Sequence, residues 1–267
     1  MKIKSYKPPV EIALLSLVMI IFISSVSYNV AIVSASDGGL KVWPRNATVD
    51  NLTLDDHSIR WWKILLETPL PSNPANDPDG RYCHTGMIGT TFYPYGNFGG
   101  EGQIRHCTIP AGMTIFGAAL AFECSFDEYP QLKTLDELRS CTKQGADAIS
   151  SYSVEIDGKP LNPSDIYRIE SRPFNFTWGN PNIYGLNLPA GKVGTSIEDG
   201  YFFAIQPLSA GEHRIRVTGS VVADPASGNP GFALDQTYLL TIENPANMVS
   251  GAQNTSMPFF NSSSPSS

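Results

Sequence analysis

From residue 150 onward the chain consists of short segments in which apolar and polar residues alternate, separated by glycine and proline. Segment 152–156 alternates before Asp157-Gly158, a pair typical of two-residue hairpin turns, and 213–218 alternates again after Gly211. A period of two places one face of a strand in a core and the other in water. With 23 glycines and 21 prolines in 267 residues, this pattern predicts a mainly β fold, an antiparallel β-sandwich of the jelly-roll or immunoglobulin-like kind.

Two short helices are expected to be attached to the sandwich. Thr53 to Asp56 and Thr134 to Glu137 have the spacing of capping boxes, in which the first and fourth residues bond each other's backbone. The first helix should run to about Glu67, where prolines follow. Between the helices, 113–124 is almost entirely apolar and predicts a buried strand. Further strands are predicted at 201–205 and 236–242.

Residues 1–35 are typical of an export signal. Three lysines precede the apolar run 12–23, and Val33-Ser34-Ala35 fits the small-x-small pattern of a cleavage site. The run is shorter than the roughly 20 residues that span a bilayer. Further apolar residues extend it, so an uncleaved anchor over 12–33, the only expected membrane contact, is the alternative.

The remaining chain divides by composition. Residues 36–50 are predicted to be an extended leader, and 51–244 a single disulfide-stapled sandwich domain. Residues 245–267 are rich in Ser and Asn with few apolar anchors, which predicts a disordered tail.

The cysteines and sequons agree with an extracellular or cell-surface location. An even number of cysteines in an exported chain indicates disulfides, and proximity favours Cys83–Cys107 and Cys124–Cys141 among the three pairings. N-x-[ST] sequons outside the tail predict a glycoprotein modified at Asn46, Asn51 and Asn175.

A series of short motifs appears in this order: Trp61-Trp62, Cys83, Cys107–Gly112, Glu123-Cys124-Ser125 and 201–217. In this order they resemble a group of uncharacterised secreted bacterial and archaeal proteins, over most of residues 58–242. The strands around Asp157-Gly158 and Gly211 also resemble immunoglobulin-like modules of cell-surface proteins. The resemblance implies a β-rich exported domain and carries no site residue over.

Two histidines flank the first cysteine pair. If Cys83 and Cys107 face each other on antiparallel strands, the same register places His84 opposite His106 on the other face of the sheet. Both imidazoles would then reach one divalent metal ion, with Glu123 as a candidate third ligand. The alternative is two surface histidines without a ligand, because two ligands alone do not make a zinc site.

Carboxylates and aromatic residues give two further candidate sites. Glu123, Asp127 and Glu128 cluster around Cys124, and paired carboxylates serve acid/base hydrolysis of glycosides or bind calcium. Tyr93, Tyr95 and Trp178 lie in loop-like segments and are candidates for binding a polysaccharide by apolar contact. The alternatives are a solvated loop and aromatic residues that pack against the core.

The expected function is therefore an exported binding or structural module of the cell envelope or medium. Its partner would be a polysaccharide or another envelope protein. A net charge of −7 argues against nucleic acid, which needs a basic face. No cofactor is expected beyond the metal ion considered above, and no nucleophile motif is present. A secreted hydrolase using carboxylates near Glu123, and a metal-binding protein using His84 and His106, are the alternatives.

Overall fold

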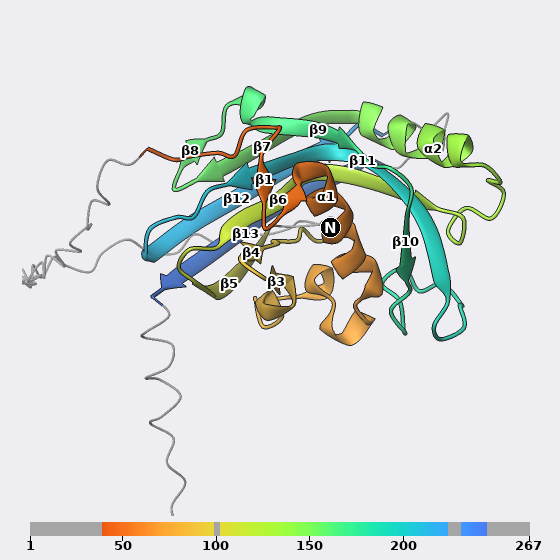
Figure 1. Ribbon diagram of the computed structural model, residues 1–267, viewed down its shortest axis with the longest axis horizontal. Helices are drawn as coiled ribbons and strands as arrows, with labels where there is room; N and C mark the ends of the chain where they lie inside the picture. Colours follow the sequence, from red (N-terminus) through yellow and green to blue (C-terminus); the bar gives the residue numbers. More distant parts are fainter. Residues whose placement is uncertain (1–38, 99–101, 224–230, 245–267) are drawn as a thin grey trace, which may run out of the picture. The chain divides into compact units, whose positions relative to one another are not determined.

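The computed structural model describes residues 39–98, 102–223 and 231–244, which are coloured in Figure 1. They form two packed β-sheets, with helix α1 (Leu54–Glu67) and helix α2 (Leu135–Asp147) attached. The predicted fold class, a mainly β sandwich with two helices, is confirmed. The predicted export signal, residues 1–35, and the predicted disordered tail, residues 245–267, lie outside the described residues.

The first sheet has the order β10-β11-β6-β4-β3, and β9 also pairs with β11. Its strands are β3 (Met87–Ile88), β4 (Thr91–Phe92), β6 (Thr114–Ser125), β9 (Ile166–Glu170), β10 (Phe174–Thr177) and β11 (Val193–Ile205). The second sheet has the order β5-β13-β12-β7-β8. Its strands are β5 (Gln103–Pro110), β7 (Ile149–Ile156), β8 (Lys159–Pro160), β12 (Gly211–Val221) and β13 (Phe232–Glu243).

Smaller elements complete the described chain. A hairpin joins β1 (Thr48–Val49) to β2 (Leu52–Thr53), and 3₁₀ helices lie at Leu70–Ser72, Pro74–Asn76, Cys83–Gly86 and Pro163–Asp165. Most strand pairs are antiparallel, as expected, but β4–β6 and β5–β13 are parallel. Both sheets are therefore mixed.

The first sheet is buried on both faces. Successive side chains of a strand point to opposite sides, so each of its long strands contributes to two cores. On β6, Ile115 enters the core between the two sheets, while Phe116 packs on the other face against α1. Phe203 and Phe202 of β11 divide between the two cores in the same way. The molecule thus has three layers over this region: the second sheet, the first sheet and α1.

A β-bulge shifts this alternation within β6. The register between β6 and β11 changes after Tyr201, so that Ala119 and Leu120 both enter the core between the sheets. Ala121 therefore returns to the α1 face, where it packs against the α1-side core. Two residues further on, the alternation brings Glu123 to the same face.

The described part of the expected leader belongs to the sandwich. Val42 forms a β-bridge with Ile205, and the Trp43 backbone N–H donates to the carbonyl of Ala204 at 2.8 Å. The Trp43 indole N–H donates to Thr114 Oγ1 at 3.2 Å. Residues 39–50 are thus attached to the first sheet before the hairpin β1–β2 leads into α1.

Both capping boxes are confirmed at the starts of α1 and α2, with Thr53 and Thr134 as the N-caps. Both disulfides proposed from proximity are also present. Cys83–Cys107 and Cys124–Cys141 have Cα–Cα distances of 5.8 Å and 6.2 Å. The second bond ties α2 to the end of β6.

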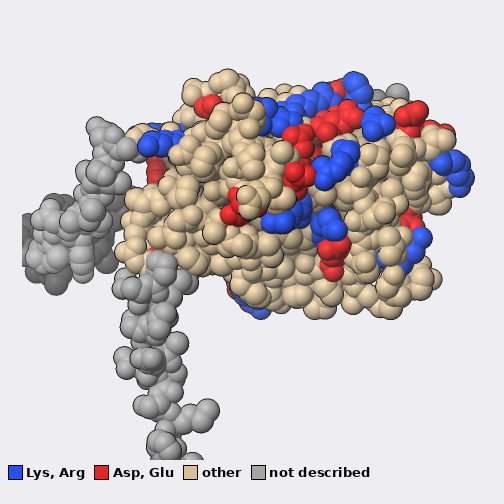
Figure 2. All heavy atoms as spheres, viewed as in Figure 1, with Lys and Arg blue, Asp and Glu red and all other residues tan. Residues whose placement is uncertain are grey.

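Acidic and basic side chains lie next to one another on the face seen in Figure 2. Arg168 pairs with both Asp147 and Asp199, at 2.7 Å and 2.6 Å, and Arg139 pairs with Glu170 at 2.9 Å. Charges over α2, β9 and β11 are therefore largely compensated by neighbours.

Candidate functional site

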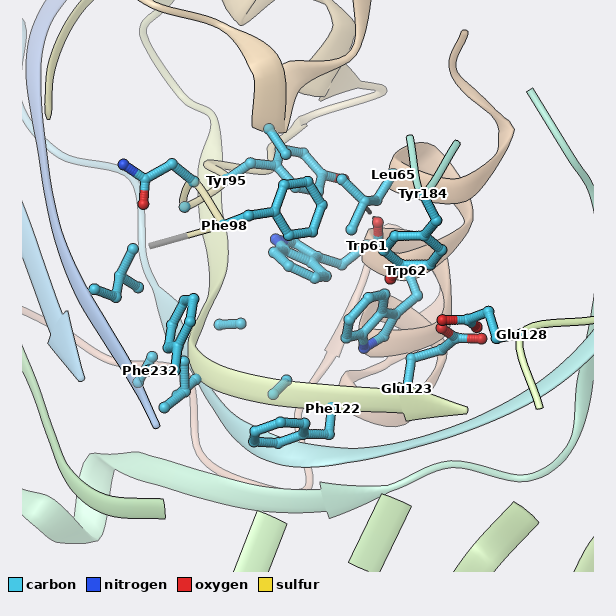
Figure 3. Close-up of a pocket in the computed structure, with 18 of the residues that line it drawn as sticks. Trp61, Trp62, Leu65, Tyr95, Phe98, Phe122, Glu123, Glu128, Tyr184 and Phe232 are labelled. Atoms are coloured by element: carbon cyan, nitrogen blue, oxygen red, sulfur yellow. Dashed lines mark hydrogen bonds between the residues drawn. The ribbon is translucent and has the colours of Figure 1, made fainter. Parts of the chain in front are cut away.

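A cavity of about 350 Å³ lies between the C-terminal half of α1, the edge of β6 and segment 95–98 (Figure 3). This volume falls in the range of roughly 300–1,000 Å³ that is typical of small-molecule sites. The aromatic lining includes Trp61, Trp62, Tyr95, Phe98, Tyr184 and Phe232. One end carries the carboxyl groups of Glu123 and Glu128, which lie together in Figure 3.

The cavity exists because β6 loses its neighbour on one side. β4 pairs with β6 only as far as Ile115, and the described β6 has no partner strand on that side beyond this point. Pro94 follows β4 and has no N–H with which to continue the ladder. Its carbonyl instead accepts from the Trp61 indole N–H at 2.9 Å. The open edge of β6 thereby becomes one wall of the cavity.

Tyr95 forms a fixed part of the aromatic wall. Its ring stacks on Trp61 with centroids 4.6 Å apart, and its hydroxyl donates to the Trp61 carbonyl at 2.8 Å. Its own carbonyl accepts from Arg105 Nη1 at 2.6 Å and from the Tyr238 hydroxyl at 2.8 Å. Tyr95 is therefore held from both α1 and the second sheet.

Phe98 and Tyr184 form the outer part of the wall. Their rings meet edge to face with centroids 5.9 Å apart, and Tyr184 makes a similar contact with Trp178. Phe98 is 54% exposed and Tyr129 is 36% exposed, whereas Trp61 and Trp62 are buried. The exposed aromatic rings thus mark the side on which the cavity meets solvent.

Glu123 and Glu128 form a hydrogen-bonded carboxyl pair. Burial raises the pKa of both groups, that of Glu123 well above its usual range, and the charge of Glu128 raises the pKa of Glu123 further. The hydrogen bond between them raises the pKa of Glu123 and lowers that of Glu128. Since two carboxylates only accept, Glu123 carries the proton and donates to Glu128.

The remaining contacts of the pair come from hydroxyl groups, and one of them is that of Tyr184, which is hydrogen-bonded to Glu123. Ser196 Oγ contacts Glu123 Oε1, and Ser125 Oγ donates to Glu128 Oε2 at 2.7 Å. Glu123 is 7% exposed, and its Oε2 has no donor among the described residues. A proton shared with Glu128, or a positive group in the cavity, would satisfy that oxygen.

The predicted carboxylate cluster separates into two parts. Asp127 turns away from the cavity: it pairs with Lys192 at 2.9 Å and accepts from the Trp178 indole N–H at 2.8 Å. In the part of the chain that the structure describes, neither Glu123 nor Glu128 forms an ion pair with a lysine or arginine. The charge of the pair is therefore uncompensated, while the charge of Asp127 is balanced.

The three aromatic residues predicted from sequence to bind a ligand have different positions. Tyr93 and Trp178 are only 1% and 4% exposed and pack in the core beneath α1. The Tyr93 hydroxyl is hydrogen-bonded to His57 at 2.6 Å. Tyr95 is the one of the three that lines the cavity, although it too is buried.

The strand register assumed for His84 and His106 is wrong. Cys83 begins the 3₁₀ helix Cys83–Gly86, so its disulfide with Cys107 on β5 does not join two paired strands. β5 pairs with β13 instead, and the backbone N–H of His106 donates to Asp79. Glu123 lies on the first sheet. Among the described residues, no three His, Cys, Asp or Glu side chains are placed to hold a metal ion.

Trp61 and Trp62 were interpreted from sequence only as part of a helix and of a motif. They are adjacent on α1, with ring centroids 5.1 Å apart at nearly a right angle, and both line the cavity. Both belong to the buried stripe of α1, in which Leu65 and Leu66 lie one turn further on. The spacing thus predicts that both rings face inward, but only the fold shows that they line a cavity.

Some of the features that predict export lie within the residues that the structure describes. Two disulfides are typical of proteins that fold in an oxidising compartment. Among the described residues, no helix is long and apolar enough to cross a membrane. Asn46, Asn51 and Asn175 are exposed, and their glycosylation stays a prediction.

Comparison with protein-family models, with curated proteins and with solved structures finds no match to this chain.

Proposed function

We propose that this protein is an exported binding module and that the cavity between α1 and β6 holds a small organic ligand, either free or as the end group of a larger molecule. The observation that carries the proposal is an aromatic-lined cavity with a buried carboxyl pair at one end. Sites of this kind combine apolar walls with a few polar groups that orient the ligand.

The same geometry supports binding better than glycoside hydrolysis. Enzymes that use two carboxyl groups on a glycosidic bond hold them about 5–9.5 Å apart, which leaves room for the sugar and the attacking water. Glu123 and Glu128 share a hydrogen bond and are closer than that. Polysaccharide binding was predicted from three aromatic residues, and two of them, Tyr93 and Trp178, are buried in the core.

A cavity-filling variant tests the proposal. Ala118 lines the cavity from β6, and Ala118→Leu adds three carbon atoms there. We expect small aromatic or aliphatic compounds to raise the melting temperature of the wild type, since a ligand that binds only the folded state stabilises it. For Ala118→Leu, the same rise in melting temperature should require at least a tenfold higher ligand concentration.

Ala210→Leu is the matched control, because Ala210 is exposed in the turn before β12. It should leave the ligand response unchanged. A response that is equal in both variants would place the binding elsewhere and overturn the proposal. A fragment set that includes neutral sugars and gives no response at all would do the same.

A further inference from the structure

The charge at the inner end of the cavity identifies the ligand class. Glu123 and Glu128 together offer four carboxyl oxygens, and the described residues provide only uncharged donors to them: the hydroxyls of Ser125, Ser196 and Tyr184 and the backbone N–H of Ser125. Ionising both groups without a counter-charge is costly in a buried site. A positive group in the cavity would remove that cost.

The cavity wall suits the same kind of group. Cations are attracted to the faces of tryptophan and tyrosine rings, and more strongly when the site is desolvated. Trp62 and Tyr184 both lie next to the carboxyl pair in Figure 3. Burial, and after it the charges of Glu123 and Glu128, raise the pKa of Tyr184 well above its usual range, so the Tyr184 ring lies in the negative field of the carboxyl pair.

A neutral sugar fits this wall less well. A monosaccharide carries several hydroxyl groups, and each one buried without a partner costs free energy. Besides the two glutamates, the described lining offers few polar side chains, mainly the hydroxyls of Tyr129 and Tyr184 and the amide of Asn97. An amine with an apolar body needs polar partners at one end only.

We infer that the cavity recognises an organic cation, with an ammonium group held between the carboxyl groups of Glu123 and Glu128 and an apolar body against the rings of Trp61, Trp62 and Tyr184. The inference rests on the proposed binding function and names its ligand class. In the ligand-free protein a proton occupies the place between the two carboxyl groups, and the ammonium group displaces it. Binding therefore releases a proton.

The groups facing the carboxyl pair set the pH dependence. They are Tyr129 from the turn after β6, Tyr184, and Ser196 and Glu198 from β11, with Trp62 from α1. The carboxylate of Asp127 turns away from the pair, although its charge still acts on Glu128. Lys192 compensates Asp127. Because the pair must lose its proton to bind the cation, affinity should rise with pH until the pair is ionised.

The experiment compares benzylamine with benzyl alcohol, a neutral molecule of nearly the same shape, by calorimetry at pH 7.5 in buffers of different ionisation enthalpy. We expect benzylamine to bind at least tenfold more tightly and to release a proton. Glucose serves as the neutral polyhydroxyl probe. Glu123→Gln and Glu128→Gln should each abolish the preference for the amine, and Glu123→Gln should fold because Glu123 is already neutral in the free protein.

Asp127→Asn is the matched control, because it removes a neighbouring carboxylate that already has a cationic partner. It should keep the preference for benzylamine. Equal binding of amine and alcohol, or tighter binding of glucose, would overturn the cation inference and leave the binding function standing. If none of the three probes binds and Ala118→Leu changes no ligand response, both proposals fail.

Discussion

Glu198 lies fully buried on β11 beneath α1, and such burial favours the protonated form of a carboxyl group. Ser58 Oγ lies 2.7 Å from Glu198 Oε1 and 2.9 Å from the Asp55 carbonyl. A hydroxyl has one hydrogen to donate, and the carbonyl only accepts. Ser58 Oγ is therefore a donor that Glu198 shares with Asp55, and no lysine or arginine among the described residues pairs with Glu198. Burial raises the pKa of Glu198 well above its usual range, so Glu198 is assigned the protonated form.

Glu198→Gln should consequently become more stable relative to the wild type as pH rises. A carboxyl whose folded pKa is raised binds more protons in the folded than in the unfolded state, so its contribution to stability falls with increasing pH. The fall begins near the unfolded pKa of about 4.3 and reaches at most about 1.4 kcal/mol per pH unit. Denaturant unfolding of both proteins at pH 4.5 and pH 8 measures the difference. Parallel stability curves would contradict the assignment.

His57 is held as a neutral imidazole under α1. Its Nε2 lies 3.0 Å from the Val49 carbonyl and must carry the hydrogen, which leaves Nδ1 to accept from the Tyr93 hydroxyl at 2.6 Å. Burial lowers the pKa of His57 below its usual 6.5, with Arg60 as a further cause.

We expect His57 to remain neutral, with the hydrogen on Nε2, at pH 6. The unfolded chain takes up the proton first, so stability should decline as pH falls below about 6.5. Two-dimensional NMR that correlates ring protons with ring nitrogens distinguishes the tautomers and the charged form. A charged His57 ring at pH 6 would rule out this arrangement.

At the scale of elements, the sequence predicts what depends on neighbours in the chain. Thr53 and Thr134 give both helix starts, and Asp157-Gly158 forms the hairpin turn between β7 and β8 with positive φ at both residues. The bulge at Ala119 carries no such local signal, because its cause is the match between β6 and β11. The bulge decides that Glu123 faces α1, so no local pattern predicts that side of the site.

The disulfide between Cys124 and Cys141 should mainly stabilise α2. It closes a loop with a sequence separation of 17 residues, and such a crosslink stabilises by about 2–4 kcal/mol. We expect the double variant C124A/C141A to lose that much and to lose hydrogen-exchange protection first in α2.

The variant C83A/C107A is the matched comparison, with a separation of 24 residues. It should be destabilised by a similar amount while the amides of α2 stay protected. Uniform loss of protection in both variants would show that α2 does not depend on its own crosslink. Labelling of the denatured wild type, isolated without reductant, should find no free thiol.

At the scale of the whole molecule, pairing between distant segments limits prediction. The segment 236–242 predicts a strand, but it does not reveal that β13 pairs in parallel with β5, more than 100 residues earlier. The same limit applies to the cavity. Glu123 and Tyr95 were candidates from sequence, each in a different proposed site, and only the fold brings them to one cavity with Trp61 and Trp62.

Arg105 ties these distant segments together. Its side chain is fully buried on β5, and none of its described partners is a carboxylate. It donates to the carbonyls of Ala75 at 3.2 Å, Asp77 at 2.7 Å and Tyr95 at 2.6 Å, and it lies 5.8 Å from the ring centroid of Tyr238. Carbonyl oxygens and a ring face therefore solvate the charge of Arg105. The same hydrogen bonds hold the backbone at Tyr95, which forms part of the cavity wall.

Arg105→Met should destabilise the protein by at least about 2 kcal/mol, because buried carbonyl acceptors left without a donor cost about 1–3 kcal/mol each. Arg216→Met is the matched control: Arg216 is paired with Asp235 at 2.8 Å on the surface, where such pairs contribute about 0–1 kcal/mol. Arg105→Lys keeps the charge but not the planar set of five donors, so it should restore only part of the loss. Urea unfolding followed by tryptophan fluorescence measures all three. If Arg105→Met costs no more than Arg216→Met, the carbonyls find water instead, and Arg105 does not hold the wall of the cavity.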